Sequence, residues 1–186
     1  LRDYDALLRH AGVPPDPDPP ALPIPSPAAE RARAALSSAL VPERFVALCP
    51  GSATAPEKRW PAARYAALAR VLSERGISCA VAVGPAEREL GRTVAAACPF
   101  PLPVVGADLD AVELAAVLAR ALAVASNDSG PAHLAAAVGT PTVVFFGPTN
   151  PGRTAPVGAR VRVLERMEEV TAEEAARAVE EMIESR

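Results

Sequence analysis

Apolar and polar stretches alternate along most of the chain. Short runs of Val, Phe, Leu, Ile and Ala predict buried strands, and the longer Ala-rich segments between them predict helices. The expected strands are 45–49, 77–83, 103–106, 121–125, 142–146 and 160–164, and the expected helices are 28–40, 61–75, 85–97, 110–120, 131–138 and 171–185. Strands that alternate with helices predict an α/β fold, here a Rossmann-like parallel sheet with helices on both faces.

The first 42 residues differ in composition from the rest. Residues 1–11 can form a short amphipathic helix, whereas residues 13–27 contain eight prolines, too many for a helix or a central strand. We therefore expect residues 1–42 to be an inter-domain connection and residues 43–186 to be a separate folded domain. The first residue is Leu rather than Met, which suggests a fragment of a longer protein.

Composition and charge exclude several classes of protein. The net charge of −3 argues against nucleic acid as a partner. No apolar run reaches about 18 residues, so no transmembrane segment is expected, and the charged residues near the N-terminus exclude a signal peptide. The three cysteines (Cys49, Cys79 and Cys98) have no C-x-x-C spacing and are expected to be buried thiols of a reducing compartment.

A polar turn, S-N-D-S-G-P-A-H, separates a predicted strand from a predicted helix at residues 126–133. Ligands of parallel sheets bind beyond the carboxyl ends of strands, where a helix N-terminus attracts anions, so we expect a phosphate or nucleotide site here. Gly130 lets a phosphate approach the backbone, and Ser129 can cap the helix and donate its hydroxyl. A Ser-Asp-His triad is not expected, because Asp128, Ser129 and His133 lie within six residues of one another.

Two residues of this turn have more than one interpretation. Asp128 would repel a diphosphate placed against it, so we expect its carboxylate to cap the turn or to accept hydrogen bonds from sugar hydroxyls. His133 lies one turn into the helix and can reach phosphate or sugar. Alternatively, it is a buried histidine hydrogen-bonded to a neighbouring loop.

Lys58 is the only lysine among nineteen basic residues. Its compact ammonium suits a single phosphate oxygen, and Ser52 and Thr54 in the same loop can add hydroxyls and backbone N–H groups. We expect Lys58→Ala to weaken nucleotide binding and to leave the stability of the unliganded chain nearly unchanged. The alternative is an ordinary solvated lysine in a loop. Trp60 is expected to pack against the start of the next helix rather than to form a platform for a base.

Glu87 follows a predicted strand and a Gly-Pro turn. A carboxylate at this place can accept two ribose hydroxyls, or it can stabilise a helix N-terminus by its charge. Glu89 is the competing candidate for the ribose. The chain has no P-loop, no G-x-G-x-x-G fingerprint after a strand and no metal-ligand spacing, so we expect a nucleotide-sugar site without metal or cofactor.

Two motifs together resemble a known family. S-N-D-S-G-P-A-H followed by F-F-G-P-T-N-P, and C-P-G-S-A-T-A-P-E-K-R-W-P upstream, are similar to the signatures of glycosyltransferase family 9, the ADP-heptose:lipopolysaccharide heptosyltransferases. The resemblance covers residues 45–153 most strongly and implies the C-terminal half of a GT-B enzyme. It implies diphosphate contacts for Lys58 and Thr54, ribose contacts for Glu87 and sugar contacts for Asp128. Ala53 departs from the hydroxyl residue of some members, and residues 160–171 lack a Cys-rich insertion that many members carry.

The resemblance also implies a reaction and a place. The expected activity is inverting, metal-independent transfer of heptose from ADP-heptose to the lipopolysaccharide inner core, in the cytoplasm at the inner face of the inner membrane. The family's general base is an aspartate of the N-terminal domain, so no catalytic residue is expected in this chain, which alone should bind the donor without transferring sugar. Two alternatives remain: a stand-alone nucleotide or nucleotide-sugar binding module, and another GT-B-type enzyme such as a nucleotide-sugar epimerase.

Overall fold

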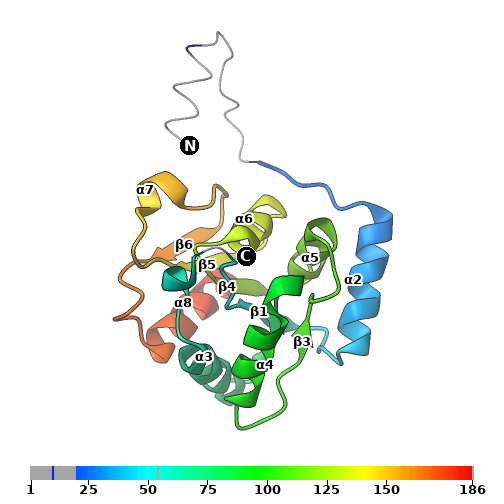
Figure 1. Ribbon diagram of the computed structural model, residues 1–186, viewed down its shortest axis with the longest axis horizontal. Helices are drawn as coiled ribbons and strands as arrows, with labels where there is room; N and C mark the ends of the chain where they lie inside the picture. The colour runs from blue at the N-terminus through cyan, green and yellow to red at the C-terminus, as the bar shows by residue number, and fades with distance from the viewer. Residues whose placement is uncertain (1–9, 11–19, 54, 186) are drawn as a thin grey trace.

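In the computed structural model, which describes residue 10 and residues 20–53 and 55–185, six parallel strands form one sheet in the order β3-β2-β1-β4-β5-β6. Their bounds are β1 Phe45–Cys49, β2 Ser78–Ala82, β3 Val104–Val105, β4 Ala123–Asn127, β5 Thr142–Phe145 and β6 Val161–Leu164. The order reverses at the centre, because the chain builds outward from β1 to β3 and then returns to the other side of β1 with β4 (Figure 1). The predicted Rossmann-like α/β fold is confirmed.

Helices cover both faces of this sheet (Figure 1). Helices α3, α4 and α8 pack on one face, and α2, α5 and α6 pack on the other. The bounds are α2 Ser26–Ser38, α3 Ala62–Glu74, α4 Arg88–Ala96, α5 Ala111–Leu118, α6 Gly130–Ala137, α7 Pro151–Thr154 and α8 Ala172–Glu184, with 3₁₀ turns η1 Pro56–Lys58 and η2 Pro85–Glu87. The helix expected at residues 1–11 and most of the Pro-rich linker lie outside the described residues.

Strand β1 lies at the centre of the sheet and is buried along its whole length. Val46 and Leu48 join the hydrophobic cluster under α3 and α8, whereas Phe45, Ala47 and Cys49 join the cluster under α2 and α5. Alternate side chains of a strand point to opposite faces, and here both faces are covered. This is why the strand is a continuous apolar run and shows no polar alternation.

Several predicted bounds differ from the structure for local reasons. Strand β4 extends to Asn127, which was expected in the turn, because Asn127 pairs in register with Phe145 of β5. Strand β3 has only two residues, and Pro103 precedes it without an N–H for the ladder. The helix expected at 85–97 is divided into η2 and α4. Helix α7 was not predicted; the side chain of Asn150 caps it by accepting a hydrogen bond from Gly152 N.

Helix α2 packs against the domain core. Its buried residues Ala28, Ala32 and Leu36 lie on one face of the helix, toward the cluster that contains β1 and α5. On the surface, Arg31 Nε lies 3.2 Å from Glu113 Oε1 of α5, an exposed ion pair that contributes little to stability. The division between connection and domain at residues 42 and 43 stays a prediction.

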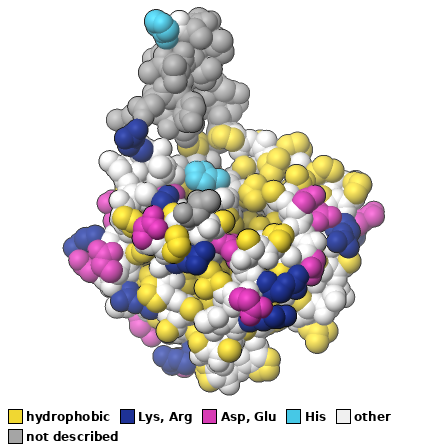
Figure 2. All heavy atoms as spheres, viewed as in Figure 1, with side chains coloured by type: hydrophobic (Ala, Val, Ile, Leu, Met, Phe, Trp, Pro, Cys, Tyr) yellow, Lys and Arg dark blue, Asp and Glu magenta, His cyan; other side chains and the backbone are white. Residues whose placement is uncertain are grey.

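The structure shows how charge is distributed on one face, and it bears on the expectations about transmembrane segments and buried cysteines. On the face that Figure 2 shows, basic and acidic side chains are interspersed. No helix among the described residues is both long enough and apolar enough to cross a membrane. Cys49 and Cys79 are buried, as predicted, but Cys98 is only half-buried, so the expectation was wrong for that residue.

Burial also predicts a pH dependence. Desolvation raises the pKa of the Cys79 thiol to about 12, and desolvation followed by the Glu87 charge raises the pKa of the Cys49 thiol well above its ordinary value. The unfolded chain releases these protons near pH 8.5, whereas the folded chain keeps them, so stability is complete below that pH and falls as pH rises. We expect each thiol to lower the free energy of unfolding by up to about 1.4 kcal/mol per pH unit above that point.

Urea denaturation between pH 8 and 10.5 measures this loss. The Cys79→Ala variant should lose less free energy of unfolding over this range than the unmodified chain, whatever its stability at pH 8. Equal slopes for the two proteins would contradict the buried, protonated thiol.

Candidate functional site

A cleft of about 870 Å³ opens beside the carboxyl ends of β1 and β4, where the strand order reverses. Its polar part is formed by the loop after β1, the turn after β4 and the first turn of α6. Its apolar part is formed by residues of the segment at 20–22, α6 and the segment after α7. The lining residues that carry polar or charged side chains are Ser52, Lys58, Asp128, Ser129, His133, Arg153 and Thr154. Binding at such a reversal point is the general rule for open α/β sheets.

Lys58 and Asp128 form an ion pair across this cleft, although seventy residues separate them. Lys58 Nζ lies 2.9 Å from Asp128 Oδ2, and the side chains are 23% and 3% exposed. The 3₁₀ turn η1 ends at Lys58 and brings its ammonium to the turn after β4. Lys58 is therefore not a solvated loop lysine, and its removal would leave a buried carboxylate without its cation.

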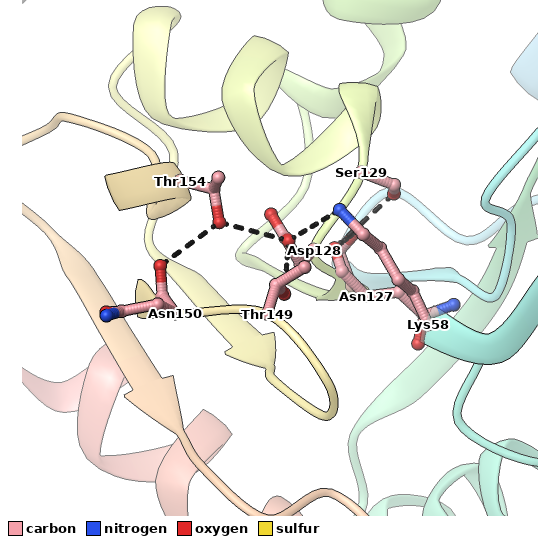
Figure 3. Close-up of polar contacts among 8 residues, drawn as sticks. Lys58, Asn127, Asp128, Ser129, Thr149, Asn150 and Thr154 are labelled. Atoms are coloured by element: carbon pink, nitrogen blue, oxygen red, sulfur yellow. Dashed lines mark hydrogen bonds and ion pairs between the residues drawn. The ribbon is translucent and has the colours of Figure 1, made fainter. Parts of the chain in front are cut away.

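The Asp128 carboxylate accepts three hydrogen bonds on one oxygen (Figure 3). Besides Lys58, the Thr149 and Thr154 hydroxyls donate to Oδ2 at 2.7 and 3.2 Å. The predicted capping of the turn is absent, because α6 has no side-chain cap within the described residues. Asp128 instead joins three separate segments: η1, the turn after β4, and the chain after β5.

Asn127 lies just before Asp128 and has no exposed surface. Its Oδ1 accepts hydrogen bonds from Trp60 N and the Tyr65 hydroxyl, each at 2.9 Å. Its Nδ2 donates to the backbone oxygens of Pro50 at 2.7 Å and Gly51 at 3.2 Å. All the hydrogen-bonding capacity of the side-chain amide is used, and the end of β4 is tied to the loop after β1 and the start of α3.

The first turn of α6 presents its backbone to the cleft. Ser129 is at the N-cap position, but its hydroxyl donates to Asn127 O at 3.4 Å instead of capping the helix. Pro131 occupies the first turn, where its missing N–H is not needed. A Cβ built on Gly130 would meet no atom within 4 Å, so the space beside this glycine is open. His133 is exposed and lines the cleft, so the alternative of a buried histidine was wrong.

The loop after β1 supplies the opposite wall. Ser52 is buried and lines the cleft, and the Arg59 guanidinium holds its backbone oxygen with Nη2 at 2.9 Å and Nε at 3.2 Å. Thr54 lies outside the described residues, so its predicted phosphate contact stays a prediction. Trp60 is 1% exposed and stacks on Phe145 with ring centroids 4.3 Å apart, which confirms that it is a core residue.

Glu87 does not line the cleft. Its carboxylate sits directly over Gly51: a Cβ at Gly51 would come within 2.1 Å of Glu87 Oε2, so only glycine permits this approach. Glu87 Oε1 is buried, and no described residue forms a hydrogen bond with it. Glu89 is exposed and pairs with Arg92 at 2.6 Å on the surface of α4, so it does not compete for the position over Gly51.

Sequence reasoning missed four polar residues of the site, among them Arg153, which lines the cleft from α7. Thr149 stands in the quoted F-F-G-P-T-N-P motif, and its place after a strand was an available signal. Thr154 belongs to the unpredicted α7, and nothing in its local sequence indicates a contact 26 residues away. Asn127 was read as a turn residue, although its position after a buried strand is compatible with a buried amide.

The strand order and the cleft at its reversal point define a class, the Rossmann-like α/β domains. The profile described as "Glycosyltransferase family 9 (heptosyltransferase)" matches residues 2–183, and the chain belongs to this family. The domain is similar to E. coli ADP-heptose lps heptosyltransferase II (TM-score 0.82, 23% identity, 94% of this chain and 56% of that chain). It is also similar to a family 9 glycosyl transferase of Veillonella parvula (TM-score 0.86, 24% identity, 98% and 59%).

Curated relatives are also heptosyltransferases, and they match this chain at higher sequence identity than the two solved structures. Lipooligosaccharide heptosyltransferase 2 of Haemophilus influenzae is 34% identical over 139 residues, which are 70% of this chain and 39% of that protein. The chain thus spans about two fifths of this relative's length and somewhat more than half of the two similar structures.

The Asn127 amide predicts a large effect on stability. Asn127→Ala removes the acceptor of the buried Trp60 N–H and the donor to the Pro50 and Gly51 backbone oxygens, while the Tyr65 hydroxyl keeps Cys49 O at 3.1 Å. We therefore expect the free energy of unfolding to fall by about 3 kcal/mol. Urea denaturation at pH 7 measures the change. Asn150→Ala, which removes an exposed cap of α7, is the matched control and should cost about 1 kcal/mol or less. Similar losses in the two variants would contradict the role given to Asn127.

Proposed function

We propose that this chain is the donor-binding part of a heptosyltransferase, which transfers heptose from ADP-heptose to the lipopolysaccharide inner core with inversion. The observation that carries the proposal is the single lysine, held at the strand-order reversal beside the open N-terminus of α6. A point charge and a helix N-terminus on one cleft suit a diphosphate. Membership in the heptosyltransferase family supports this choice of ligand.

Each site residue contacts a particular part of the nucleotide-sugar donor. Lys58 and the first turn of α6 at Gly130 neutralise the diphosphate, and Ser52 and Ser129 add hydroxyls at its edges. Glu87 lies over Gly51, outside the lining of the cleft. Its Oε1, which has no hydrogen-bond partner among the described residues, accepts the ribose hydroxyls of a donor that extends beyond the cleft to this carboxylate.

The sugar takes the other part of the cleft. Asp128 accepts hydrogen bonds from sugar hydroxyls on Oδ1, the oxygen to which none of the described residues donates. The exposed His133 reaches phosphate or sugar from α6. Thr54 keeps its place beside the diphosphate as a further prediction.

The chemistry of the transfer needs no metal in this proposal. Bond cleavage places negative charge on the departing diphosphate, and Lys58 with the helix N-terminus stabilises that charge. The general base must approach the acceptor hydroxyl from the opposite side of the sugar, and no residue of this chain is assigned that role. The chain alone therefore binds donor without transferring sugar, and the reaction takes place at the cytoplasmic face of the inner membrane.

The diphosphate site is tested by comparing ADP with AMP. ADP at a hundredfold excess over its Kd should stabilise the chain by roughly 2.7 kcal/mol, and AMP by much less. Lys58→Ala should weaken ADP binding by roughly 1.5 to 3 kcal/mol in isothermal titration calorimetry, and Lys58→Arg should recover only part of it. Calorimetry is the required measurement, because loss of the Asp128 ion pair also lowers the stability of the unliganded variant. Equal affinities for ADP and AMP would remove the diphosphate site.

A substitution at Gly130 should change stability and ligand affinity in opposite directions. Gly130→Ala should raise the free energy of unfolding by up to about 1 kcal/mol, since the new methyl group meets no atom and glycine is costly in a helix. The same methyl group fills the space intended for the diphosphate, so ADP affinity should fall about tenfold, a loss of about 1.4 kcal/mol. Gly76→Ala is the opposite control: its φ of +76° makes it destabilising, and ADP affinity should not change.

A further inference from the structure

The three groups that donate hydrogen bonds to Asp128 Oδ2 differ in how easily they can move to a ligand. The Thr149 and Thr154 hydroxyls lie on the segment after β5, at 2.7 and 3.2 Å from the oxygen. The Thr154 hydroxyl also lies 3.4 Å from Asn150 O, a weaker alternative acceptor. Lys58 has a long, flexible side chain that lines the cleft and is 23% exposed. Its ammonium has three N–H groups, and Asp128 is its only side-chain partner among the described residues. Its length and flexibility let Lys58 turn to a ligand without moving the backbone.

This freedom conflicts with the burial of Asp128. The carboxylate is 3% exposed, and a buried charge that loses its cation is strongly destabilised unless other donors remain. The two threonine hydroxyls are such donors, and both bind the same oxygen as the lysine (Figure 3). When Lys58 turns to a phosphate, Oδ2 keeps two hydrogen bonds, and the carboxylate stays in place.

We propose that Thr149 and Thr154 are positioning residues that hold the Asp128 carboxylate while Lys58 is transferred from it to the anionic group of the ligand. The inference rests on the proposed function for the diphosphate as that anionic group. In the ligand-free chain, Asp128 keeps Lys58 at the cleft and neutralises it. In the bound chain, the lysine charge neutralises the diphosphate, and the two threonine hydroxyls donate hydrogen bonds to Asp128.

Thr149 gives the sharper test of the two. Thr154 lines the cleft and can touch a ligand directly, whereas Thr149 does not line it and reaches the ligand only through Asp128. An effect of Thr149 on nucleotide affinity must therefore depend on the charge of Asp128. A double-mutant cycle between these two positions measures that dependence.

The cycle uses calorimetric Kd values for ADP and for inorganic pyrophosphate. Thr149→Val should weaken both ligands about tenfold, because the bound state then leaves Asp128 with one hydroxyl. In the Asp128→Asn background the same change should alter Kd less than twofold, because no charge has to be held. Thr149→Ser, which keeps the hydroxyl, should restore the affinity. Thr93→Val, which removes an exposed hydroxyl on α4 that donates to Glu89 O, is the matched control and should have no effect.

The only lysine supplies a second readout. With ¹⁵N-labelled lysine the chain gives one Nζ resonance, and pyrophosphate should shift it in the unmodified chain and in Thr149→Ser. Equal losses of affinity from Thr149→Val in both backgrounds, or no loss at all, would overturn the positioning role and leave the diphosphate site intact. If Thr149→Val fails to fold, Thr149→Ala takes its place in the same cycle. A chain that binds neither ADP nor pyrophosphate would instead overturn the proposed function, and the inference with it.

Discussion

The side-chain amide of Asn127 is the constraint on which the rest of the site depends. It lies at the end of β4, has no exposed surface and exchanges hydrogen bonds with the loop after β1 and with the start of α3. Parallel strands bring their carboxyl ends to one edge of the sheet, but that alone does not order the loops beyond them. Because the amide ties these loops together, Lys58 reaches the turn that begins at Asp128.

The second organising interaction is electrostatic and follows from the first. Asp128 is buried, and its charge is balanced by Lys58 from the loop after β1. Its carboxylate also accepts hydrogen bonds from two threonine hydroxyls on the segment after β5. A buried carboxylate without a cation or hydrogen-bond donors is strongly destabilising, so Asp128 stabilises the contact between η1, the turn after β4 and the segment after β5. The same arrangement keeps a cation at the mouth of a cleft whose opposite wall is an open helix N-terminus, which suits an anionic ligand.

The candidate site could be predicted in part. Lys58, Asp128 and Gly130 were found because they stand in short motifs at the ends of predicted strands, and the structure brings Lys58 and Asp128 into contact. Thr149 and Thr154 could not be assigned in the same way, since their contact with Asp128 depends on how the chain folds back after β5. The exposure of His133 was likewise undecided, because its neighbours on α6 are apolar in sequence but open to the cleft in space.

The sequence by itself determined the α/β alternation and the buried strand runs, because strand and helix patterns depend on residues that are near neighbours in the chain. It also placed polar residues at the ends of β1 and β4 and supplied the motifs of the family. Only the tertiary structure decided which of these residues meet. The Lys58–Asp128 pair spans seventy residues, and Glu87 reaches its place over Gly51 only because that glycine has no side chain. Contacts of this kind are set by strand order and loop packing, which no local pattern encodes.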